Sequence, residues 1–184
     1  MWERHILNCG AVAALLDADD RVADVGSGAG LPLLALAIAV PTARITLIEP
    51  LLRRTTFLTE AVARLGLDNV DVVRSRAEQL HGVLSFSRVV ARAVAPLDRL
   101  IGWCLPLVET GGELLAMKGS RAAEEIEASR EMWGRREIKP PELVTVGAGL
   151  LAEPTTVVRV SWEGPATVGL PTADERHRGS RRRR

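Results

Sequence analysis

A glycine-rich turn between an apolar strand and an apolar helical run is the feature that most constrains the fold of this chain. Residues 22–34 read VADVGSGAGLPLL, which places Gly26, Gly28 and Gly30 at alternate positions. Glycine lets a backbone turn this tightly and still lets a ligand lie against it. Open α/β sheets build nucleotide-type pockets in this way, beyond the carboxyl end of the first strand. We therefore expect a Rossmann-like sheet with a ligand at this loop.

The spacing of the three glycines indicates which kind of ligand the loop holds. The G-x-G-x-x-G pattern that seats a dinucleotide pyrophosphate is absent, because the third glycine comes one residue early. Asp24 stands two residues before the first glycine. This form favours S-adenosylmethionine, which has a ribose, an adenine and an amino acid but no phosphate. The spacing argues against the alternative of an NAD-dependent oxidoreductase.

Strand-like and helical segments alternate along the chain, which predicts a mainly parallel seven-stranded sheet with helices on both faces. Gly66 is expected to cap a helix, Gly111-Gly112 to turn into the fifth strand, and the last two strands to form a hairpin at the sheet edge. The expected strands are residues 22–25, 45–49, 70–73, 88–92, 113–117, 143–147 and 156–162. The expected helices are residues 5–16, the run from the glycine loop to residue 40, 52–65, 97–108 and 120–133.

Length and composition indicate a single soluble domain. The chain has 184 residues, about one domain, which we expect to span residues 1–163. No stretch of about 20 uncharged apolar residues exists, so no membrane span is expected. Two cysteines and three scattered histidines offer neither a disulfide framework nor a metal cluster. These features predict a cytoplasmic protein, expected to be a monomer, without a structural metal.

Residues 164–184 differ in composition from the rest of the chain and are expected to be a disordered tail. Residues 176–184 hold six of the 24 Lys and Arg residues and no acid, so the first 175 residues carry 18 basic and 23 acidic residues. An acidic body with a basic end is what a contact with a polyanion would require. The alternative is a solvated arginine-rich end without a partner.

Two acidic segments follow the second and third expected strands. Glu49 comes 21 residues after Gly28, where a carboxylate is expected to accept hydrogen bonds from ribose hydroxyls; the alternative is a solvated acid at a strand end. The segment Ser75-Arg76-Ala77-Glu78 is placed to meet the adenine ring. Ser75 and Glu78 also match a capping box, and both interpretations can hold together.

Four basic residues lie at the ends of expected strands or helices. Arg92 ends the fourth strand among small apolar residues, where an unpaired cation is costly, so it needs Asp24, a cofactor carboxylate or a structural salt bridge as a partner. Arg53 and Arg54 begin a helix and oppose its dipole, which suggests phosphate contacts. Lys118 ends the fifth strand on the same rim. Aromatic residues such as Trp103 are interpreted as packing residues.

Several collinear segments of the chain resemble the bacterial 16S ribosomal RNA guanine-N7 methyltransferase family, RsmG (GidB). They span about residues 4–160, and the Arg-His-Ile-Leu start, the Gly-Leu-Pro ending of the loop and Ala-Arg-Ala-Val-Ala are the specific ones. The segments are RHIL at residues 4–7, DVGSGAGLP at 24–32, RR at 53–54, FL at 57–58, RAE at 76–78, ARAVA at 91–95 and KG at 118–119.

The resemblance implies roles for individual positions. Gly26, Leu31, Ala77, Glu78 and Arg92 fall on the family's adenosylmethionine-contacting positions, to which the loop pattern adds Gly28, Gly30 and Glu49. The basic positions that face RNA would be Arg53, Arg54 and Lys118. Asn8 and Leu33 depart from the family pattern, which usually has aspartate and a small residue there. The family also usually has a further helical segment before the Arg-His motif, which here begins at residue 4.

The expected function is S-adenosylmethionine-dependent methylation of guanine N7 in 16S rRNA, with naked RNA or the small ribosomal subunit as the substrate. N7 carries no proton, so no general base is needed and orientation can supply much of the rate. One alternative is a methyltransferase acting on a small molecule, which the scarcity of Phe and the lack of Tyr disfavour. Another is a non-catalytic rRNA-binding or assembly protein, which need not keep the glycine loop and Glu49 together.

Overall fold

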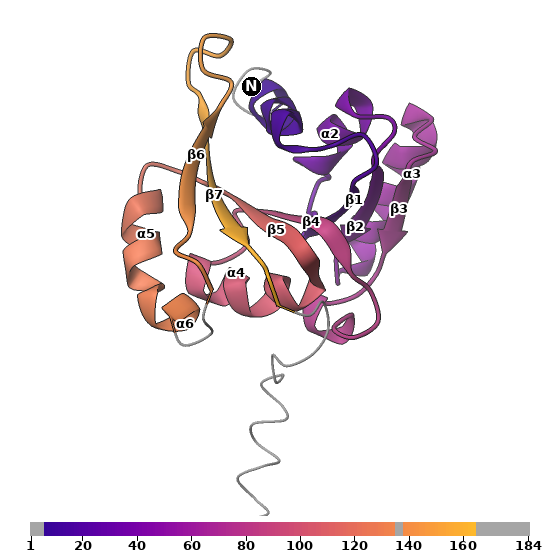
Figure 1. The fold of residues 1–184 in the computed structure, drawn as a ribbon. Helices are drawn as coiled ribbons and strands as arrows, with labels where there is room; N and C mark the ends of the chain where they lie inside the picture. Colours follow the sequence, from indigo (N-terminus) through magenta and orange to yellow (C-terminus); the bar gives the residue numbers. More distant parts are fainter. Residues whose placement is uncertain (1–5, 135–137, 165–184) are drawn as a thin grey trace, which may run out of the picture.

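The computed structural model, which describes residues 6–134 and 138–164, contains a seven-stranded sheet (Figure 1). The strand order is β3-β2-β1-β4-β5-β7-β6. The first five strands in this order, from β3 through β2, β1 and β4 to β5, pair in parallel. Strand β7 is antiparallel to both of its neighbours, β5 and β6. The predicted fold class and the edge hairpin are therefore confirmed. The strands are β1 (Arg21–Val25), β2 (Arg44–Ile48), β3 (Val70–Val73), β4 (Phe86–Arg92), β5 (Val108–Lys118), β6 (Glu142–Val146) and β7 (Thr155–Ser161).

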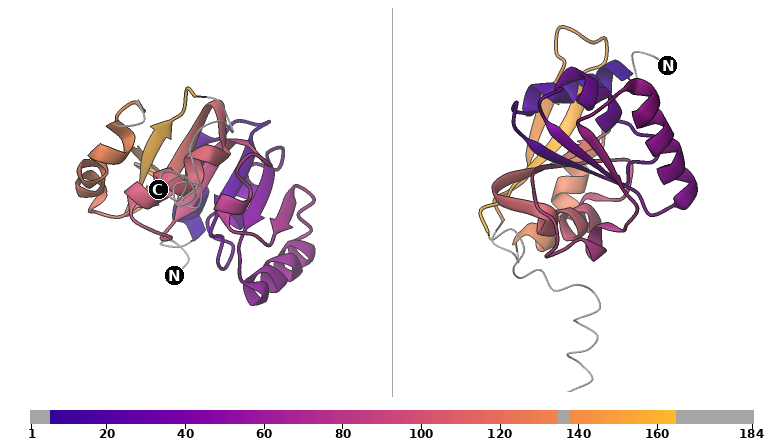
Figure 2. Two further views of the ribbon diagram at one scale, coloured as in Figure 1. Left: turned by 90° about the horizontal axis from the view of Figure 1, so that it is seen from below. Right: turned by 90° about the vertical axis from the view of Figure 1, so that its right-hand side faces the viewer.

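Helices cover both faces of the sheet (Figures 1 and 2). The helices are α1 (Asn8–Gly10), η2 (Ala11–Leu15), α2 (Leu33–Ala39), α3 (Leu52–Leu65), η3 (Ala77–Gln79), α4 (Leu97–Cys104), η4 (Leu105–Leu107), α5 (Ala122–Ala128) and α6 (Arg130–Gly134), where η marks a 3₁₀ helix. One face carries α1, η2, α2 and α3, whereas η3, α4, η4, α5 and α6 pack on the other.

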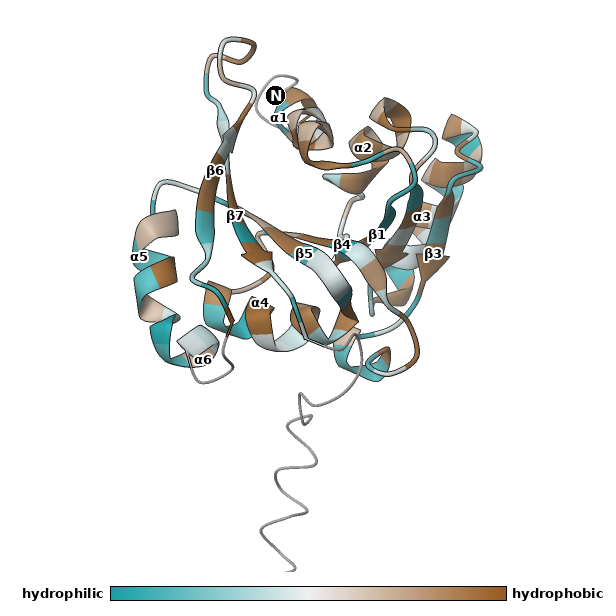
Figure 3. Ribbon diagram, viewed as in Figure 1, coloured by the Kyte–Doolittle hydropathy of each residue, from teal (hydrophilic) through white to brown (hydrophobic). Residues whose placement is uncertain are grey.

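Alternate side chains of each strand enter two separate hydrophobic cores. In β1, Val22 packs on the side of α2, whereas Ala23 and Val25 pack on the side of α4. Figure 3 shows the hydrophobic colours gathered on the strands and α2. Fully buried side chains such as Leu36 and Leu100 each stabilise the fold by about 1.5–3 kcal/mol relative to exposure. Burial on both faces explains the uninterrupted apolar runs in the middle of the inner strands, such as residues 89–91 of β4 and 114–117 of β5.

Helix α3 matches its predicted range, and Gly66 at its end has φ 63°, the left-handed conformation of a C-cap. The predicted helix over residues 5–16 is broken, because Asn8–Gly10 is followed by a 3₁₀ segment rather than a continuous α-helix. Arg4, His5 and residues 165–184 lie outside the described residues. The domain boundary at residue 163 stays a prediction. No helix of the described residues is long and apolar enough to cross a membrane.

Three predictions in the second half of the chain are wrong in detail. The helix predicted to reach Val108 ends as α4 at Cys104, and Val108 already belongs to β5. Residues 120–133 form two short helices that meet at Ser129, whose backbone N–H and side-chain hydroxyl both bond to preceding carbonyls. Gly111-Gly112 lies inside β5 rather than before it.

The glycine pair allows β5 to bulge beside β4. Phe86 pairs with Val108, but Arg88, only two residues later, pairs with Glu113, so β5 accommodates extra residues here. Gly111 has φ 80°, which favours glycine. A Cβ on Gly112 would lie 2.6 Å from the Ser87 carbonyl oxygen. The pair is therefore needed for strand packing, not for a chain reversal.

Substituting Gly112→Ala is expected to destabilise the protein by about 1–3 kcal/mol through overpacking against backbone atoms. A urea titration followed by circular dichroism measures the change. The control is Gly102→Ala in α4, where a Cβ meets nothing within 4 Å and the higher helix propensity of alanine should raise stability by up to about 1 kcal/mol. Equal effects at the two positions would contradict the bulge argument.

Candidate functional site

The glycine loop is fixed to the end of β2 by backbone hydrogen bonds. The N–H groups of Gly26 and Ser27 both donate to the Ile48 carbonyl, at 2.9 and 3.2 Å. All three loop glycines have positive φ, of 79°, 55° and 89° in chain order. A Cβ on Gly26 would lie 2.8 Å from Val94 Cγ2, and a Cβ on Gly30 would lie 2.2 Å from Leu34 Cδ1. A Cβ on Gly28 would meet open space, with one backbone oxygen at 3.8 Å. Of the three glycines, Gly28 is thus the one at which a side chain would meet open space.

Glu49 connects three segments of the site. One carboxylate oxygen, Oε2, accepts the Gly28 N–H at 3.0 Å, and the other, Oε1, accepts the Leu51 N–H at 3.0 Å. Arg54 Nη1 lies 3.5 Å from Oε2. The side chain is buried, yet a carboxylate has about four acceptor positions and keeps capacity for a ligand. The predicted acidic residue therefore meets the loop as expected, and its role toward ribose stays a prediction.

A pocket of about 430 Å³, here called the inner pocket, opens at the carboxyl ends of β1, β2 and β4. It brings together five of the predicted cofactor residues, namely Gly26, Glu49, Ala77, Glu78 and Arg92, and also Arg54. Ligands of open α/β sheets bind at this end of the strands. The remaining lining residues are Val25, Ile48, Pro50, Leu51, Ser75, Arg76, Ala93, Val94 and Trp103.

A second pocket of about 700 Å³, here called the outer pocket, lies beside it on the other side of the glycine loop. It shares Gly26, Arg54, Arg92 and Ala93 with the inner pocket, so the two meet at these residues. Gly28, Leu31 and Arg53 line only the outer pocket. Its other residues are Ser27, Ala29 and Phe57. Of the predicted cofactor residues, Gly30 lines neither pocket, because it packs against Leu34 and Leu58.

Asp24 is a buried carboxylate beneath the loop. Its Oδ2 atom is buried without a hydrogen-bond partner among the described residues. Burial raises the pKa of Asp24 to about 7, and the positive charge of Arg92 opposes that rise. Arg92 Nη1 lies 2.9 Å from the thiol of Cys9. The positive charge of Arg92 therefore acts on Asp24, whose carboxylate is buried and lines neither pocket.

Lys118 is placed differently from the other two predicted RNA-binding residues. Its ammonium donates to the Ala95 carbonyl at 2.8 Å and to Glu125 Oε2 at 2.7 Å, and its side chain is only 8% exposed. The same carboxylate oxygen accepts the Leu97 N–H at 3.1 Å. In this arrangement Lys118 holds the loop after β4, which forms a wall of both pockets. Arg53 and Arg54, by contrast, are exposed on the first turn of α3.

The predicted capping box is shifted by one residue. Gln79, not Glu78, accepts the N–H of the helix-capping residue, Arg76, at 3.1 Å, and it also accepts the Ser75 hydroxyl at 3.2 Å. The exposed Glu78 carboxylate is thus not engaged in the cap and lines the inner pocket.

Trp103 packs against the core, as the sequence predicts, but sequence reasoning missed that it also lines the inner pocket. A signal existed, since Trp103 lies outside the stripe formed by the fully buried positions of α4. Those positions are Leu97, Leu100, Ile101 and Cys104. An aromatic residue off the buried stripe of a helix is available to a ligand. Ala93, with φ 52°, gave no such signal, because alanine rarely adopts that conformation.

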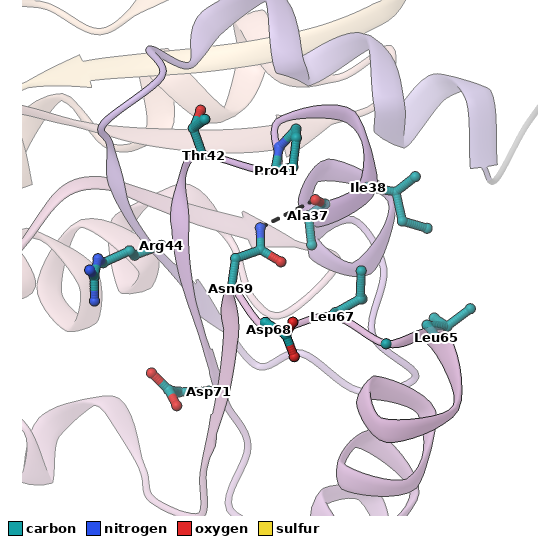
Figure 4. A pocket seen from close by; sticks show the side chains of 11 residues that line it. Ala37, Ile38, Pro41, Thr42, Arg44, Leu65, Leu67, Asp68, Asn69 and Asp71 are labelled. Atoms are coloured by element: carbon teal, nitrogen blue, oxygen red, sulfur yellow. Dashed lines mark hydrogen bonds between the residues drawn. The ribbon is translucent and has the colours of Figure 1, made fainter.

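A third hollow of about 670 Å³ lies at the opposite, amino end of β2 and β3. In Figure 4 the Asn69 side chain points to the end of α2, where it donates to the Ala37 carbonyl at 3.2 Å. It also donates to the Ala43 carbonyl at 3.1 Å. The amide therefore connects the segment before β3 to helix α2 and to the segment before β2. The carboxyl end of the sheet, not this end, is where α/β folds bind ligands.

Comparison with known proteins identifies the family of the chain. The family model of rRNA small subunit methyltransferase G (GidB) matches residues 1–151. The chain belongs to this family. The ribosomal RNA small subunit methyltransferase G of Nocardioides sp. is 55% identical over all of this chain and 74% of its own length, and that of Thermobifida fusca is 48% identical over all of this chain and 79% of its own length. The predicted family and the assignment as a methyltransferase are confirmed.

Solved structures with the same fold are distant methyltransferases. An S-adenosylmethionine-dependent O-methyltransferase of Thermotoga maritima has a TM-score of 0.66 at 14% identity, covering 86% of this chain and 65% of its own. A protein described as a putative rRNA methylase of Clostridium thermocellum has a TM-score of 0.59 at 18% identity, covering 86% and 96%. At this identity the comparison establishes the class I methyltransferase fold and nothing more.

The Asp24→Asn variant is expected to be more stable than the unsubstituted protein at pH 8, with a clearly smaller advantage at pH 5. Because burial raises the pKa of Asp24 from 3.8 to about 7, its favourable contribution is fully present only below about pH 4 and is lost progressively as the pH rises to about 7. Asparagine does not ionise and therefore removes that loss. In a protein of this size, each 1 kcal/mol gained in the free energy of unfolding raises the melting temperature by about 2–4 °C. Thermal melts at both pH values measure it. An equal advantage at pH 5 and pH 8 would contradict a buried titrating carboxylate.

Proposed function

We propose that this protein transfers the methyl group of S-adenosylmethionine to N7 of a guanine in 16S rRNA. The observation that carries the proposal is the continuity of the two pockets across Gly26 and Ala93. The inner pocket carries two acids, Glu49 and Glu78, beside apolar residues, as an adenosine site does, whereas the lining of the outer pocket contains arginines and no acid, which suits RNA. Membership of the rRNA small subunit methyltransferase G family supports this pairing.

The inner pocket fits the chemistry of S-adenosylmethionine. Glu49 lies where ribose hydroxyls can donate to its carboxylate, and Glu78 with the backbone of Ala77 faces the space for an adenine. Arg92, which lines both pockets, suits the carboxylate of the methionine part. When bound, S-adenosylmethionine supplies a methyl group made electrophilic by the sulfonium.

The chain's own residues orient the two reactants rather than move protons. The N7 lone pair forms the new N–C bond while the C–S electron pair leaves with sulfur, so the positive charge passes from sulfonium to guanine and no proton is released. No general base is needed, and the lining of both pockets contains no histidine. The wall formed by Gly26 and Ala93 is where the methyl group would cross. Holding N7 in line with it can lower the barrier by up to about 7–11 kcal/mol.

A small-molecule methyltransferase is the principal alternative. The outer pocket disfavours it, because the pocket is open and its rim carries the exposed Arg53 and Arg54 on the first turn of α3. Two cations at a helix N-terminus oppose the dipole, and of the two only Arg54 has an ion-pair partner among the described residues, Glu49 at 3.5 Å. A polyanionic substrate explains why they stand there. A non-catalytic rRNA-binding protein would have no use for the inner pocket.

The first experiment incubates the protein with methyl-labelled S-adenosylmethionine and small ribosomal subunits that lack the modification. Label is expected in 16S RNA, at a guanine that becomes sensitive to borohydride and aniline cleavage. The Gly28→Asp variant should lose the label, because it places a carboxylate beside Glu49 in the site, while aspartate tolerates the left-handed backbone there. Cofactor binding without RNA label would indicate a small-molecule substrate. Failure to bind the cofactor would refute the proposal.

Arg53→Gln is expected to weaken binding to the small subunit and to reduce the slope of log K against log salt by about 0.7 for one lost phosphate contact. Titrations over 50–200 mM salt measure the slope. The matched control is Arg64→Gln, which removes the same charge from the exposed far end of α3 and should leave the slope unchanged. A slope that is unchanged in Arg53→Gln would contradict a phosphate contact.

A further inference from the structure

Phe57 is an exposed aromatic residue with no structural reason to be exposed. The chain has two Phe residues and no Tyr. Phe86 is buried at 6% exposure, whereas Phe57 is 51% exposed. Its neighbour Leu58 is fully buried and holds α3 against the sheet. Phe57 therefore points away from the core, and its ring contributes little to packing.

The position of Phe57 places its ring in the outer pocket. It lies on α3 one turn after Arg53, and side chains four residues apart share a helix face. Across the pocket from α3 lie Leu31 and the glycine loop. The Phe57 ring and the Arg53 side chain, which share a helix face, thus line the outer pocket together with the wall that it shares with the inner pocket.

We infer that Phe57 stacks on the guanine that receives the methyl group, while Arg53 binds a phosphate beside it. The inference rests on the proposed function and names the residue that positions its acceptor. Proteins recognise unpaired RNA bases by stacking them on aromatic side chains, and each such stack typically changes affinity about 5- to 150-fold on alanine substitution. An unpaired base is required, because N7 faces the deep major groove of an A-form helix.

The charge balance of the reaction gives the ring a second effect. Methylation at N7 moves a positive charge from sulfur to the guanine ring. An aromatic face attracts a cation through its quadrupole. The stack is therefore stronger in the transition state than with neutral guanine, and an interaction that strengthens in this way accelerates the chemical step. An aliphatic side chain of similar size would fill the space without this effect.

The experiment compares Phe57→Leu and Phe57→Trp in the subunit methylation assay. Phe57→Leu is expected to lower kcat/KM for the subunit about ten-fold or more, whereas Phe57→Trp should retain most of it. Binding of S-adenosylmethionine should stay within about two-fold in both, because Phe57 lines only the outer pocket. Leu65→Ala is the matched control. Leu65 lies at the other end of α3 with 52% exposure, and kcat/KM should be unchanged.

A second measurement tests stacking without turnover. With S-adenosylhomocysteine filling the inner pocket, 7-methylguanosine monophosphate should bind about 2- to 5-fold more tightly than guanosine monophosphate, and Phe57→Leu should abolish the difference. Full activity of Phe57→Leu, or equal binding of the two nucleotides to the unsubstituted protein, would overturn the inference. If nucleotide discrimination holds but no rRNA is labelled, the proposed substrate is wrong and the stacking role stands.

Discussion

The hydrogen bonds that Glu49 accepts at the end of β2 are the contacts on which the site depends. Its carboxylate holds the Gly28 N–H from one side and the start of α3 from the other. The loop after β1 and the helix after β2 are therefore placed relative to each other by one buried acid. Glu49 itself lines the inner pocket, and the loop and the helix that it joins both border the outer pocket. Because the acid is buried, the bonds are shielded from competing water.

The site could be predicted where local sequence determines the conformation. The three alternate glycines have positive φ because the turn demands it, and Glu49 follows an apolar strand that must lie beside β1 in a parallel sheet. Each inference needs only a strand, a turn and a register. Gly66 was predictable for the same reason, since a helix C-cap is a local conformation.

The parts that could not be predicted depend on contacts between distant segments. The sequence places Lys118 at the rim, but it gives no sign that Glu125 and the Ala95 carbonyl are its partners, because these contacts form only in the tertiary structure. Gly111-Gly112 indicated a turn because the bulge against Ser87 is a tertiary feature. The separation of the pockets had no signal in the sequence either, since it arises from the arrangement of the loop, α3 and the Ala93 backbone.

The two arginines that begin α3 have different surroundings despite being adjacent. Arg54 borders both pockets and approaches Glu49, whereas Arg53 borders only the outer pocket. Substitutions at Arg53 and Phe57 can therefore alter which acceptor is used while leaving the donor side intact. A layout of this kind makes specificity separable from cofactor use, so that related enzymes can diverge in target, or be redirected by design, through one exposed face of a single helix.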